Sequence, residues 1–221
     1  MVDKLYRKPS PLGEGSSFPV PPIKGGGDFP LKNMNFLVLD TETGSRHASS
    51  TLLTAYFLVV SPEFKSLGEL YFYLKPDNNE HYVVDAQGLA VNKIDIVEHD
   101  KVAITCKQAK STLYDFLKEH SANGRRLTPL GHGVKGDIRR ITDNLISIGS
   151  WDQFCTYHFI DTSVVLQYLR AINKIPMDGD GSVGAMAEYF NIKVDGELHN
   201  AKTDAILTMR IFQKMVELGK T

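Results

Sequence analysis

Two carboxylates stand one residue apart at the end of a short apolar run. In segment 36–44, Phe-Leu-Val-Leu-Asp-Thr-Glu-Thr-Gly, Asp40 and Glu42 directly follow four apolar residues. A short run with turn residues behind it is typical of a buried strand. Side chains alternate along a strand, so both acids emerge on one face, where they repel each other unless a divalent cation lies between them. The pair predicts a metal site, although a polar turn with two solvated acids also explains an isolated Asp-x-Glu.

A third acid follows a glycine-rich turn. Segment 131–137 reads Gly-His-Gly-Val-Lys-Gly-Asp, and its glycines allow a sharp turn from a strand into a helix. Asp137 then falls in the first helical turn beside Ile138, which belongs to the apolar stripe, so we expect Asp137 to point partly toward the sheet. The alternative is a first-turn acid that only favours the helix dipole, worth about 0.3–1 kcal/mol.

A histidine and a fourth acid lie near the C-terminus, in the segment His-Asn-Ala-Lys-Thr-Asp at 199–204. Five residues span about 500° of an ideal helix, so His199 and Asp204 would lie roughly 140° apart and share no helix face. We therefore expect Asp204 in the first turns of the closing helix, His199 on the loop before it, and Asn200 as a cap. Such a histidine can reach over a metal site, although a surface histidine is the alternative.

These five residues, in this order and in these contexts, resemble the DEDDh family of 3′→5′ exonucleases. The segments that carry the resemblance are 38–44, 131–137 and 199–205, and the likeness extends over about residues 34–218. The departures are local. The family usually has Asn at the position of Gly133, an aromatic residue at Gly136 and His where this chain has Asn92.

The resemblance implies a ribonuclease H-like fold and hydrolysis of DNA or RNA from the 3′ end, with release of 5′-mononucleotides. It also implies two divalent cations, Mg²⁺ or Mn²⁺, a choice that agrees with hard oxygen ligands. Asp40 would bridge the two ions, Glu42 and Asp204 would complete one site, and Asp137 would support the other. His199 would be the general base toward the attacking water.

Substrate contacts follow from the same resemblance. The backbone at Thr43 and Gly44 is expected near the terminal sugar, and Leu89 and Asn92 near the last base or its ribose. Four basic residues flank the catalytic segments, and both phosphate binding and plain solvation explain them: Lys135, Arg139, Arg140 and Lys202. The implied partners are single-stranded DNA or RNA, or duplex 3′ ends, with a second copy of the chain or a polymerase as a protein partner.

Two alternatives of function stay open. One is a weakly active nucleic-acid-binding or polymerase-associated subunit on the same fold, although none of the acids nor the histidine is missing. The other is a different metal-dependent phosphohydrolase on a ribonuclease H-like scaffold, against which the spacing of His199 and Asp204 argues.

The pattern of apolar residues predicts an α/β protein with a mixed five-stranded sheet, in which three antiparallel strands precede βα units, flanked by helices. The expected strands are 35–40, 52–61, 69–75, 125–132 and 157–161. The expected helices are 86–94 (one or two), 101–120, 134–148 with Gly149 as its stop, 162–172, 183–190 and 201–218. Residues 1–33, rich in Pro and Gly, are expected to form an extended, partly ordered arm before an exonuclease domain at 34–221.

Composition sets broad limits. The 221 residues suffice for one domain, and a net charge of −1 gives no overall basic signal for nucleic acid. The two cysteines, Cys106 and Cys155, form no CxxC pattern, which suits a reducing compartment. The longest apolar run, 52–60, is too short to cross a bilayer, and the N-terminus shows no signal-peptide pattern. We therefore expect no membrane contact and a cytoplasmic location.

Overall fold

A computed structural model describes residues 34–47, 49–77, 80–121 and 125–219, so the predicted N-terminal arm lies outside the described residues. The strands are β1 Phe36–Thr43, β2 Leu52–Val60, β3 Ser66–Lys75, β4 Ile104–Thr105, β5 Thr128–Gly131 and β6 Ile160–Asp161. The helices are α1 Ala86–Asn92, α2 Ile96–Val102, α3 Cys106–His120, α4 Val134–Asn144, α5 Ile148–Phe154, α6 Thr162–Ala171, α7 Val183–Tyr189 and α8 Ala201–Gly219.

The strands form one mixed sheet in the order β4-β3-β2-β1-β5-β6. β1, β2 and β3 are antiparallel neighbours, whereas β5 runs parallel to β1 and β6 parallel to β5. This confirms the mixed α/β sheet with an antiparallel meander followed by βα units. The central strand β2 is buried along its whole length, as its unbroken apolar sequence predicts.

The prediction of five strands was wrong by one short edge strand. Residues 101–120 were expected as a single helix, but Ile104 and Thr105 pair with β3 as β4 and separate α2 from α3. Thr105 also starts α3 through a capping box, in which Thr105 Oγ1 accepts from Gln108 N and Gln108 Oε1 accepts from Thr105 N. The Thr-x-x-Gln pattern therefore marks a helix start that apolar spacing alone did not reveal.

A second boundary was also placed wrongly. Gly149 does not end α4, because that helix ends at Asn144 and Gly149 lies inside the next helix, α5. Ser147 begins α5 by accepting a hydrogen bond from Ser150 N at 3.3 Å. The apolar spacing continues from Ile141 to Ile148 although the helix does not, since a serine cap restarts the helical pattern.

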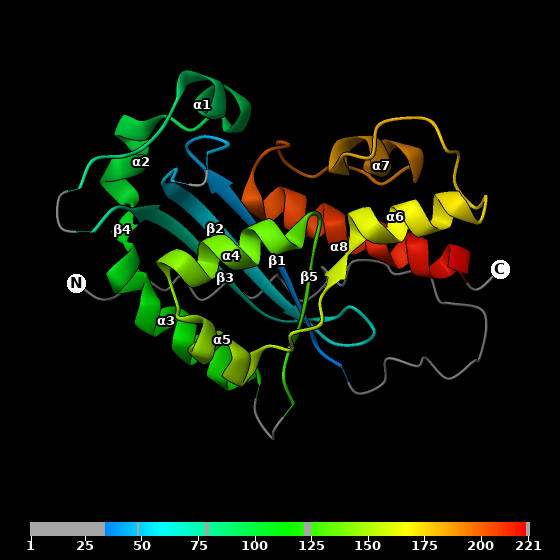
Figure 1. Cartoon of the computed structure of the whole chain (residues 1–221), viewed down its shortest axis with the longest axis horizontal. Coiled ribbons are helices and arrows are strands. Elements are labelled where there is room, and N and C mark those ends of the chain that lie inside the picture. Colours follow the sequence, from blue (N-terminus) through cyan, green and yellow to red (C-terminus); the bar gives the residue numbers. More distant parts are fainter. Residues whose placement is uncertain (1–33, 48, 78–79, 122–124, 220–221) are drawn as a thin grey trace.

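The alternation of β1 sorts its side chains between two cores. Leu37 and Leu39 pack in the core that includes α3, α4 and α5, whereas Phe36 and Val38 pack in the core that includes α8. Figure 1 shows the helices α3, α4 and α5 in front of the sheet and α8 behind it. The next residues of β1 continue this alternation into the region where the predicted site lies.

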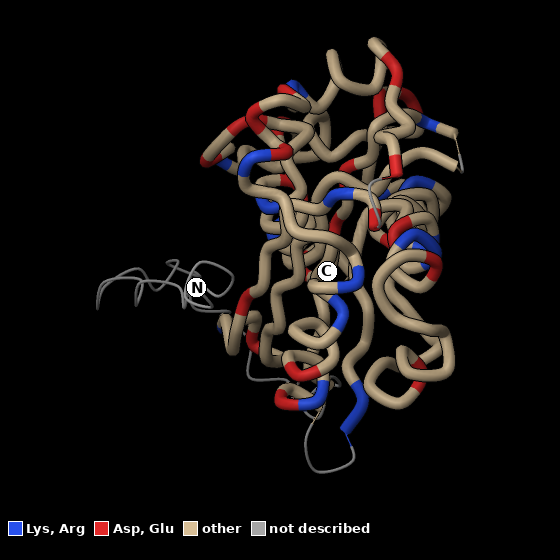
Figure 2. The backbone as a smooth tube through the Cα atoms, turned by 90° about the vertical axis from the view of Figure 1, so that its left-hand side faces the viewer, with Lys and Arg blue, Asp and Glu red and all other residues tan. Residues whose placement is uncertain are grey.

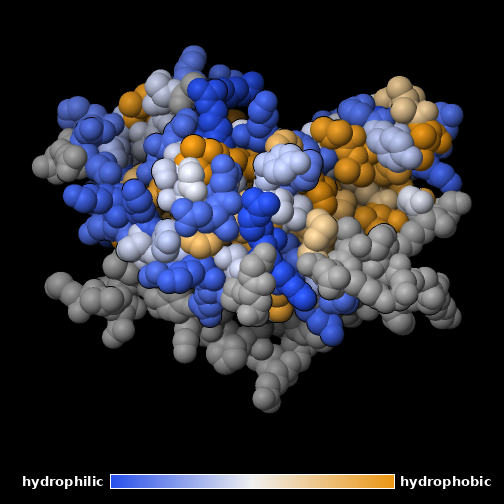
Figure 3. Space-filling model, turned by 60° about the horizontal axis from the view of Figure 1, so that its bottom comes forward, coloured by the Kyte–Doolittle hydropathy of each residue, from blue (hydrophilic) through white to orange (hydrophobic). Residues whose placement is uncertain are grey.

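The surface carries mixed charge, and Figure 2 shows basic and acidic positions interspersed along the backbone. Apolar atoms gather on the right of Figure 3, on the side where Figure 1 places α6 and α7. On α6 and at its C-terminal end, the exposed apolar residues are spaced by four: Val164, Tyr168 and Ile172. Within the described residues, no helix combines the length and apolar character needed to cross a bilayer.

Candidate active site

Three of the predicted acids converge at the C-terminal end of β1. Asp40 and Glu42 follow Phe36 and Val38 on the face that packs against α8, and α8 carries Asp204 in its first turn. Ligand oxygens of all three side chains lie within 4.8 Å of one another. The period of the strand and the start of the last helix thus build one carboxylate cluster from segments far apart in the sequence.

Asp137 approaches the cluster from the other face of the sheet. Thr41, between the two acids of β1, points toward α4, and its Oγ1 donates to Asp137 Oδ1 at 2.5 Å. Burial raises the pKa of both Asp40 and Glu42, and the charge of Asp137 raises each further, so the fourth acid belongs to the same electrostatic unit. The sequence alone did not reveal Thr41, because its partner lies 96 residues away.

The α4 turn is shaped by Gly133, which caps the helix with a φ of 71° in the left-handed region that glycine adopts without strain. Gly133 N donates to Asp161 Oδ1 at 2.9 Å. His132 Nδ1 lies 2.9 Å from Thr162 Oγ1, so this histidine ties β5 to α6 rather than to the carboxylates.

His199 lies on the loop before α8, as the spacing predicts. Asn200 begins the helix, since its Oδ1 accepts from Lys202 N at 3.1 Å and Thr203 N at 3.3 Å. His199 adopts a φ of 62°, and its N–H donates to Asp204 Oδ2 at 3.0 Å. The ring is exposed. The histidine loop and the acid of α8 are therefore held together by the backbone.

Burial and mutual repulsion make the cluster hard to ionise in the metal-free protein. Burial, helped by the charges of Asp204 and Asp137, raises the pKa of Glu42 to about 8, and burial raises that of Asp137 to about 7. Burial also raises the pKa of Asp40 and of Asp204. Four acids with this shift need compensating positive charge to ionise together near neutral pH.

The donor set fits divalent cations. Asp204 Oδ1 is buried and accepts no hydrogen bond from the described residues, while Oδ2 is held by the His199 backbone. Burying a carboxylate oxygen that accepts no hydrogen bond is costly unless a cation binds it in place of the missing donor. All the clustered ligands are hard oxygens, which Mg²⁺, Mn²⁺ and Ca²⁺ prefer.

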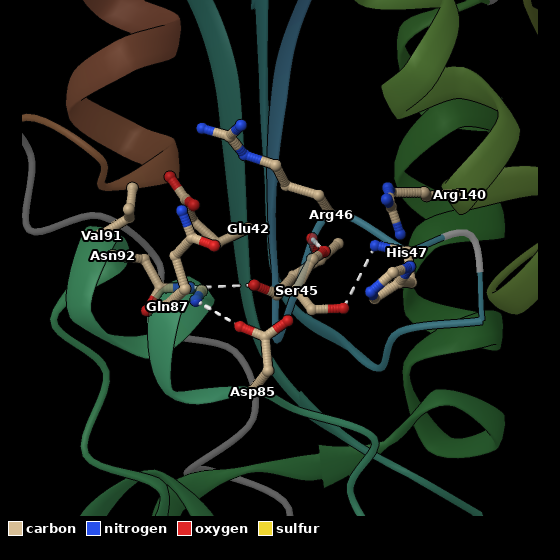
Figure 4. Close-up of a pocket in the computed structure, with 11 residues that line it drawn as sticks. Glu42, Ser45, Arg46, His47, Asp85, Gln87, Val91, Asn92 and Arg140 are labelled. Atoms are coloured by element: carbon tan, nitrogen blue, oxygen red, sulfur yellow. Dashed lines mark hydrogen bonds between the residues drawn. The ribbon is translucent and has the colours of Figure 1, made fainter.

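A cleft of about 550 Å³ opens beside the cluster and shares Glu42 with it (Figure 4). Of the four predicted substrate contacts, Thr43 and Asn92 line this cleft, whereas Gly44 and Leu89 are not among its lining residues. Asn92 Nδ2 donates to Thr43 O at 3.0 Å, and Asn92 Oδ1 accepts from Ile94 N at 3.1 Å. Its carboxamide therefore fastens α1 to the end of β1.

Several lining residues were missed from the sequence: Ser45, Arg46, His47, Asp85, Gln87, Gly88 and Val91. Residues 45–47 lie in a polar loop with no periodicity, so nothing in the pattern marks them. Among the four flanking basic residues, Arg140 lines the cleft. Lys202 instead pairs with Glu69 at 3.0 Å, Arg139 pairs with Asp143 at 3.5 Å, and Lys135 is exposed.

Comparison with solved structures agrees with the fold. The chain superimposes with a TM-score of 0.65 on cell-death related nuclease 4, at 17% identity, covering 85% of this chain and 65% of that one. For E. coli exonuclease I in complex with a dT13 oligonucleotide, the TM-score is 0.64 at 15% identity, covering 83% and 40%. For S. pombe Pop2p in its Mg²⁺- and Mn²⁺-bound form, it is 0.57 at 17% identity, covering 81% and 82%. The chain thus spans less than two thirds of the first two proteins.

A curated protein gives a partial match of another kind. The teichoic acid poly(glycerol phosphate) polymerase of Staphylococcus epidermidis is 24% identical over 152 residues, which is 65% of this chain and 19% of that protein. Such a short share of a larger protein assigns no activity to the chain.

A family model matches more than half of the sequence. Residues 65–215 match the DEDDh model described as DNA polymerase III subunit epsilon-like, C-terminal domain. The matched segment contains Asp137, His199 and Asp204, while Asp40 and Glu42 precede it and join them through β1. The chain therefore belongs to the DEDDh exonuclease family.

Proposed function

We propose that the chain is a metal-dependent 3′→5′ exonuclease that hydrolyses phosphodiester bonds of DNA or RNA and releases 5′-mononucleotides. The observation that carries the proposal is the convergence of Asp40, Glu42 and Asp204, with Asp137 held against them by Thr41. Membership of the DEDDh family supports it, as does the likeness to an exonuclease I complex with an oligonucleotide. We expect the enzyme to act in the cytoplasm.

In this proposal, the four acids would hold two divalent cations, Mg²⁺ or Mn²⁺, which would supply electrostatic stabilisation of the oxygens on which charge develops. Burial and the charges of Asp137, Glu42 and Asp204 all raise the pKa of Asp40, so this acid would help to hold both ions. Glu42 and Asp204 would complete one site, and the orphaned Asp204 Oδ1 supports this assignment. Asp137 would serve the second site, with its orientation fixed by Thr41. The likeness to Pop2p with Mg²⁺ and Mn²⁺ bound is in keeping with this choice.

His199 would accept the proton of the attacking water. Histidine is the side chain most often used as a general base, because its neutral ring can accept a proton. Its position on a loop leaves the exposed ring free to reach substrate, while the hydrogen bond from His199 N to Asp204 keeps the loop beside the acids. Thr43, Gly44, Leu89 and Asn92 are proposed to surround the terminal nucleotide.

The test compares the wild-type protein with Asp40→Asn and His199→Ala on single-stranded DNA and RNA, with Mg²⁺, with Mn²⁺ and with EDTA. We expect mononucleotide release that requires the metal and falls by at least about 100-fold in either variant, the usual scale of general-base and electrostatic effects. Circular dichroism controls for folding. Activity that survives EDTA, or that either substitution leaves unchanged, would refute the proposed mechanism.

A second candidate is a weakly active, polymerase-associated subunit. It is favoured by the polymerase-subunit family model and by the exposed apolar residues of α6, which include Val164 and Tyr168. Light scattering of the purified chain measures whether it forms a homodimer instead of pairing with a polymerase. Full exonuclease activity of a monomer would exclude both a weakly active role and a need for a partner.

A further inference from the structure

The cleft beside the carboxylates is lined by three basic side chains that the proposed chemistry does not use. Arg46 and His47 reach it from the loop after β1, and Arg140 reaches it from α4. In Figure 4, Arg140 and His47 lie on one side of the cleft and Gln87 and Asn92 on the other, while the Arg46 side chain extends above the cleft toward the side of Glu42. Two segments 93 or more residues apart in the sequence thus bring nitrogen-bearing side chains to one space.

The arginines on the cleft are not held in ion pairs within the described residues, although the charge of Arg140 opposes the burial that raises the pKa of Asp137. Neither Arg46 nor Arg140 has an ion pair there, whereas Arg139, next to Arg140, pairs with Asp143. The two acids on the cleft have other tasks. Asp85 caps α1 by accepting from Gly88 N at 2.6 Å, and Glu42 belongs to the carboxylate cluster. The guanidinium groups are therefore available to an anion from solution.

The helix leaves room for that anion. Gly136 lies one helical turn before Arg140, on the same side of α4. A Cβ atom added at Gly136 would meet no atom within 4 Å. The surface of α4 one turn before Arg140 is therefore open to solvent.

We propose that Arg46, His47 and Arg140 form a phosphate subsite that binds a phosphate of the nucleic acid other than the one being hydrolysed. The guanidinium group matches phosphate geometry with paired N–H donors. The inference rests on the proposed function, since it assumes that the 3′ end enters this cleft. The bound group is either the phosphodiester next to the scissile one or a phosphate carried on the 3′ end itself.

The test measures binding of a fluorescent single-stranded oligodeoxynucleotide by anisotropy in EDTA, so that no hydrolysis occurs. We expect Arg46→Gln to weaken binding about tenfold and to lower the salt dependence by about one counterion. Arg46 is substituted instead of Arg140, because the charge of Arg140 also lowers the pKa of Asp137 and its removal would disturb the carboxylate cluster. The matched control is Arg125→Gln, an exposed arginine that precedes β5 at the opposite end of the strands.

Two further substrates separate the sources of the phosphate. If an internal linkage is bound, a neutral methylphosphonate at that linkage weakens wild-type binding and leaves Arg46→Gln unaffected. If a terminal phosphate is bound, a 3′-phosphorylated strand binds more tightly than a 3′-hydroxyl strand, and Arg46→Gln abolishes the difference. Equal binding by Arg46→Gln and Arg125→Gln on all substrates would overturn the subsite. Hydrolysis in Mg²⁺ is measured separately. If the wild-type protein shows Arg46-dependent binding but no hydrolysis, the proposed exonuclease activity is contradicted and the phosphate subsite is not.

Discussion

At the scale of the residue, Thr41 shows how one strand serves two faces of a site. Asp40 and Glu42 point toward α8, and Thr41 between them points toward α4, where it donates to Asp137. This hydrogen bond lowers the pKa of Asp137 against the larger, opposite effect of burial. Thr41 is therefore a positioning residue, which acts through the carboxylate that it holds.

We predict that Thr41→Val raises the pKa of Asp137 in the metal-free protein, because the valine keeps the shape of threonine but donates no hydrogen bond. Less of Asp137 is then ionised near neutral pH. The Mg²⁺ concentration for half-maximal activity should rise by about tenfold, in line with a lost hydrogen bond to a charged group, and the acidic limb of the pH–rate profile should move to higher pH. Thr41→Ser keeps the hydroxyl and should resemble the wild type. Identical metal requirements for the valine and serine variants would show that the hydrogen bond has no such role.

The sequence predicts part of the site for clear physical reasons. The two-residue period of a strand places Asp40 and Glu42 on one face, and the helical period separates His199 from Asp204. Both expectations agree with the geometry. Thr41, Arg46 and His47 could not be found in this way, because their importance depends on where distant elements come to lie.

At the scale of the element, α1 is fastened closely to the end of β1. Asp85 N donates to Gly44 O at 2.9 Å, and Asn92 Nδ2 donates to Thr43 O at 3.0 Å. Gly88 lies so near that a Cβ atom there would stand 2.3 Å from Gly44 O. One wall of the cleft is thus set by backbone contact between a short helix and the strand that carries the acids.

We predict that Gly88→Ala lowers the free energy of unfolding by about 1–3 kcal/mol, because the methyl group overlaps a backbone carbonyl that cannot move aside cheaply. The shift of α1 should also raise KM, since α1 lines the cleft. The matched control is Gly149→Ala in α5, where a Cβ atom meets nothing within 4 Å. That variant should be neutral or stabilising by up to about 1 kcal/mol, as expected for glycine replaced in a helix. Urea denaturation of both variants measures the difference, and an equally stable Gly88→Ala would contradict the close approach.

Element boundaries followed from the sequence where apolar periodicity and caps agreed. The meander of β1, β2 and β3 and the closing helix α8 were expected close to their observed limits. The periodicity misled where two helices share one apolar stripe across a break, as between α4 and α5. The sequence did not predict β4, because two residues are too few to show a period and because its pairing with β3 is a tertiary contact.

At the scale of the whole molecule, the raised pKa values of the clustered acids should make the stability of the metal-free protein depend on pH. Glu42 and Asp137 have raised pKa values of about 8 and about 7, so the folded state holds more protons than the unfolded state from about pH 4 upward. The free energy of unfolding should therefore fall as pH rises through this window. Burial lowers the pKa of His99 and His132, which has the opposite effect near and below pH 6.5.

We predict that in EDTA the melting temperature falls between pH 6.5 and about 8.5, above the range in which the histidines oppose the effect. Glu42→Gln, which cannot ionise, should show a shallower decline. Mg²⁺ should restore the wild-type melting temperature at the upper end of the range, because an ion that binds only the folded state stabilises it. Thermal melts across pH, with and without Mg²⁺, provide the measurement. A wild-type slope no steeper than that of Glu42→Gln would rule out this electrostatic origin.

The central claim is that the clustered acids and His199 remove nucleotides from the 3′ end. The most direct measurement follows two copies of one strand, labelled at the 5′ end or at the 3′ end, during incubation with the protein and Mg²⁺. The claim predicts that the 3′ label appears at once as a mononucleotide, while the 5′-labelled strand shortens stepwise from its 3′ end. With the Asp40→Asn variant, neither strand should change. Immediate release of the 5′ label, or internal fragments from both strands, would contradict it.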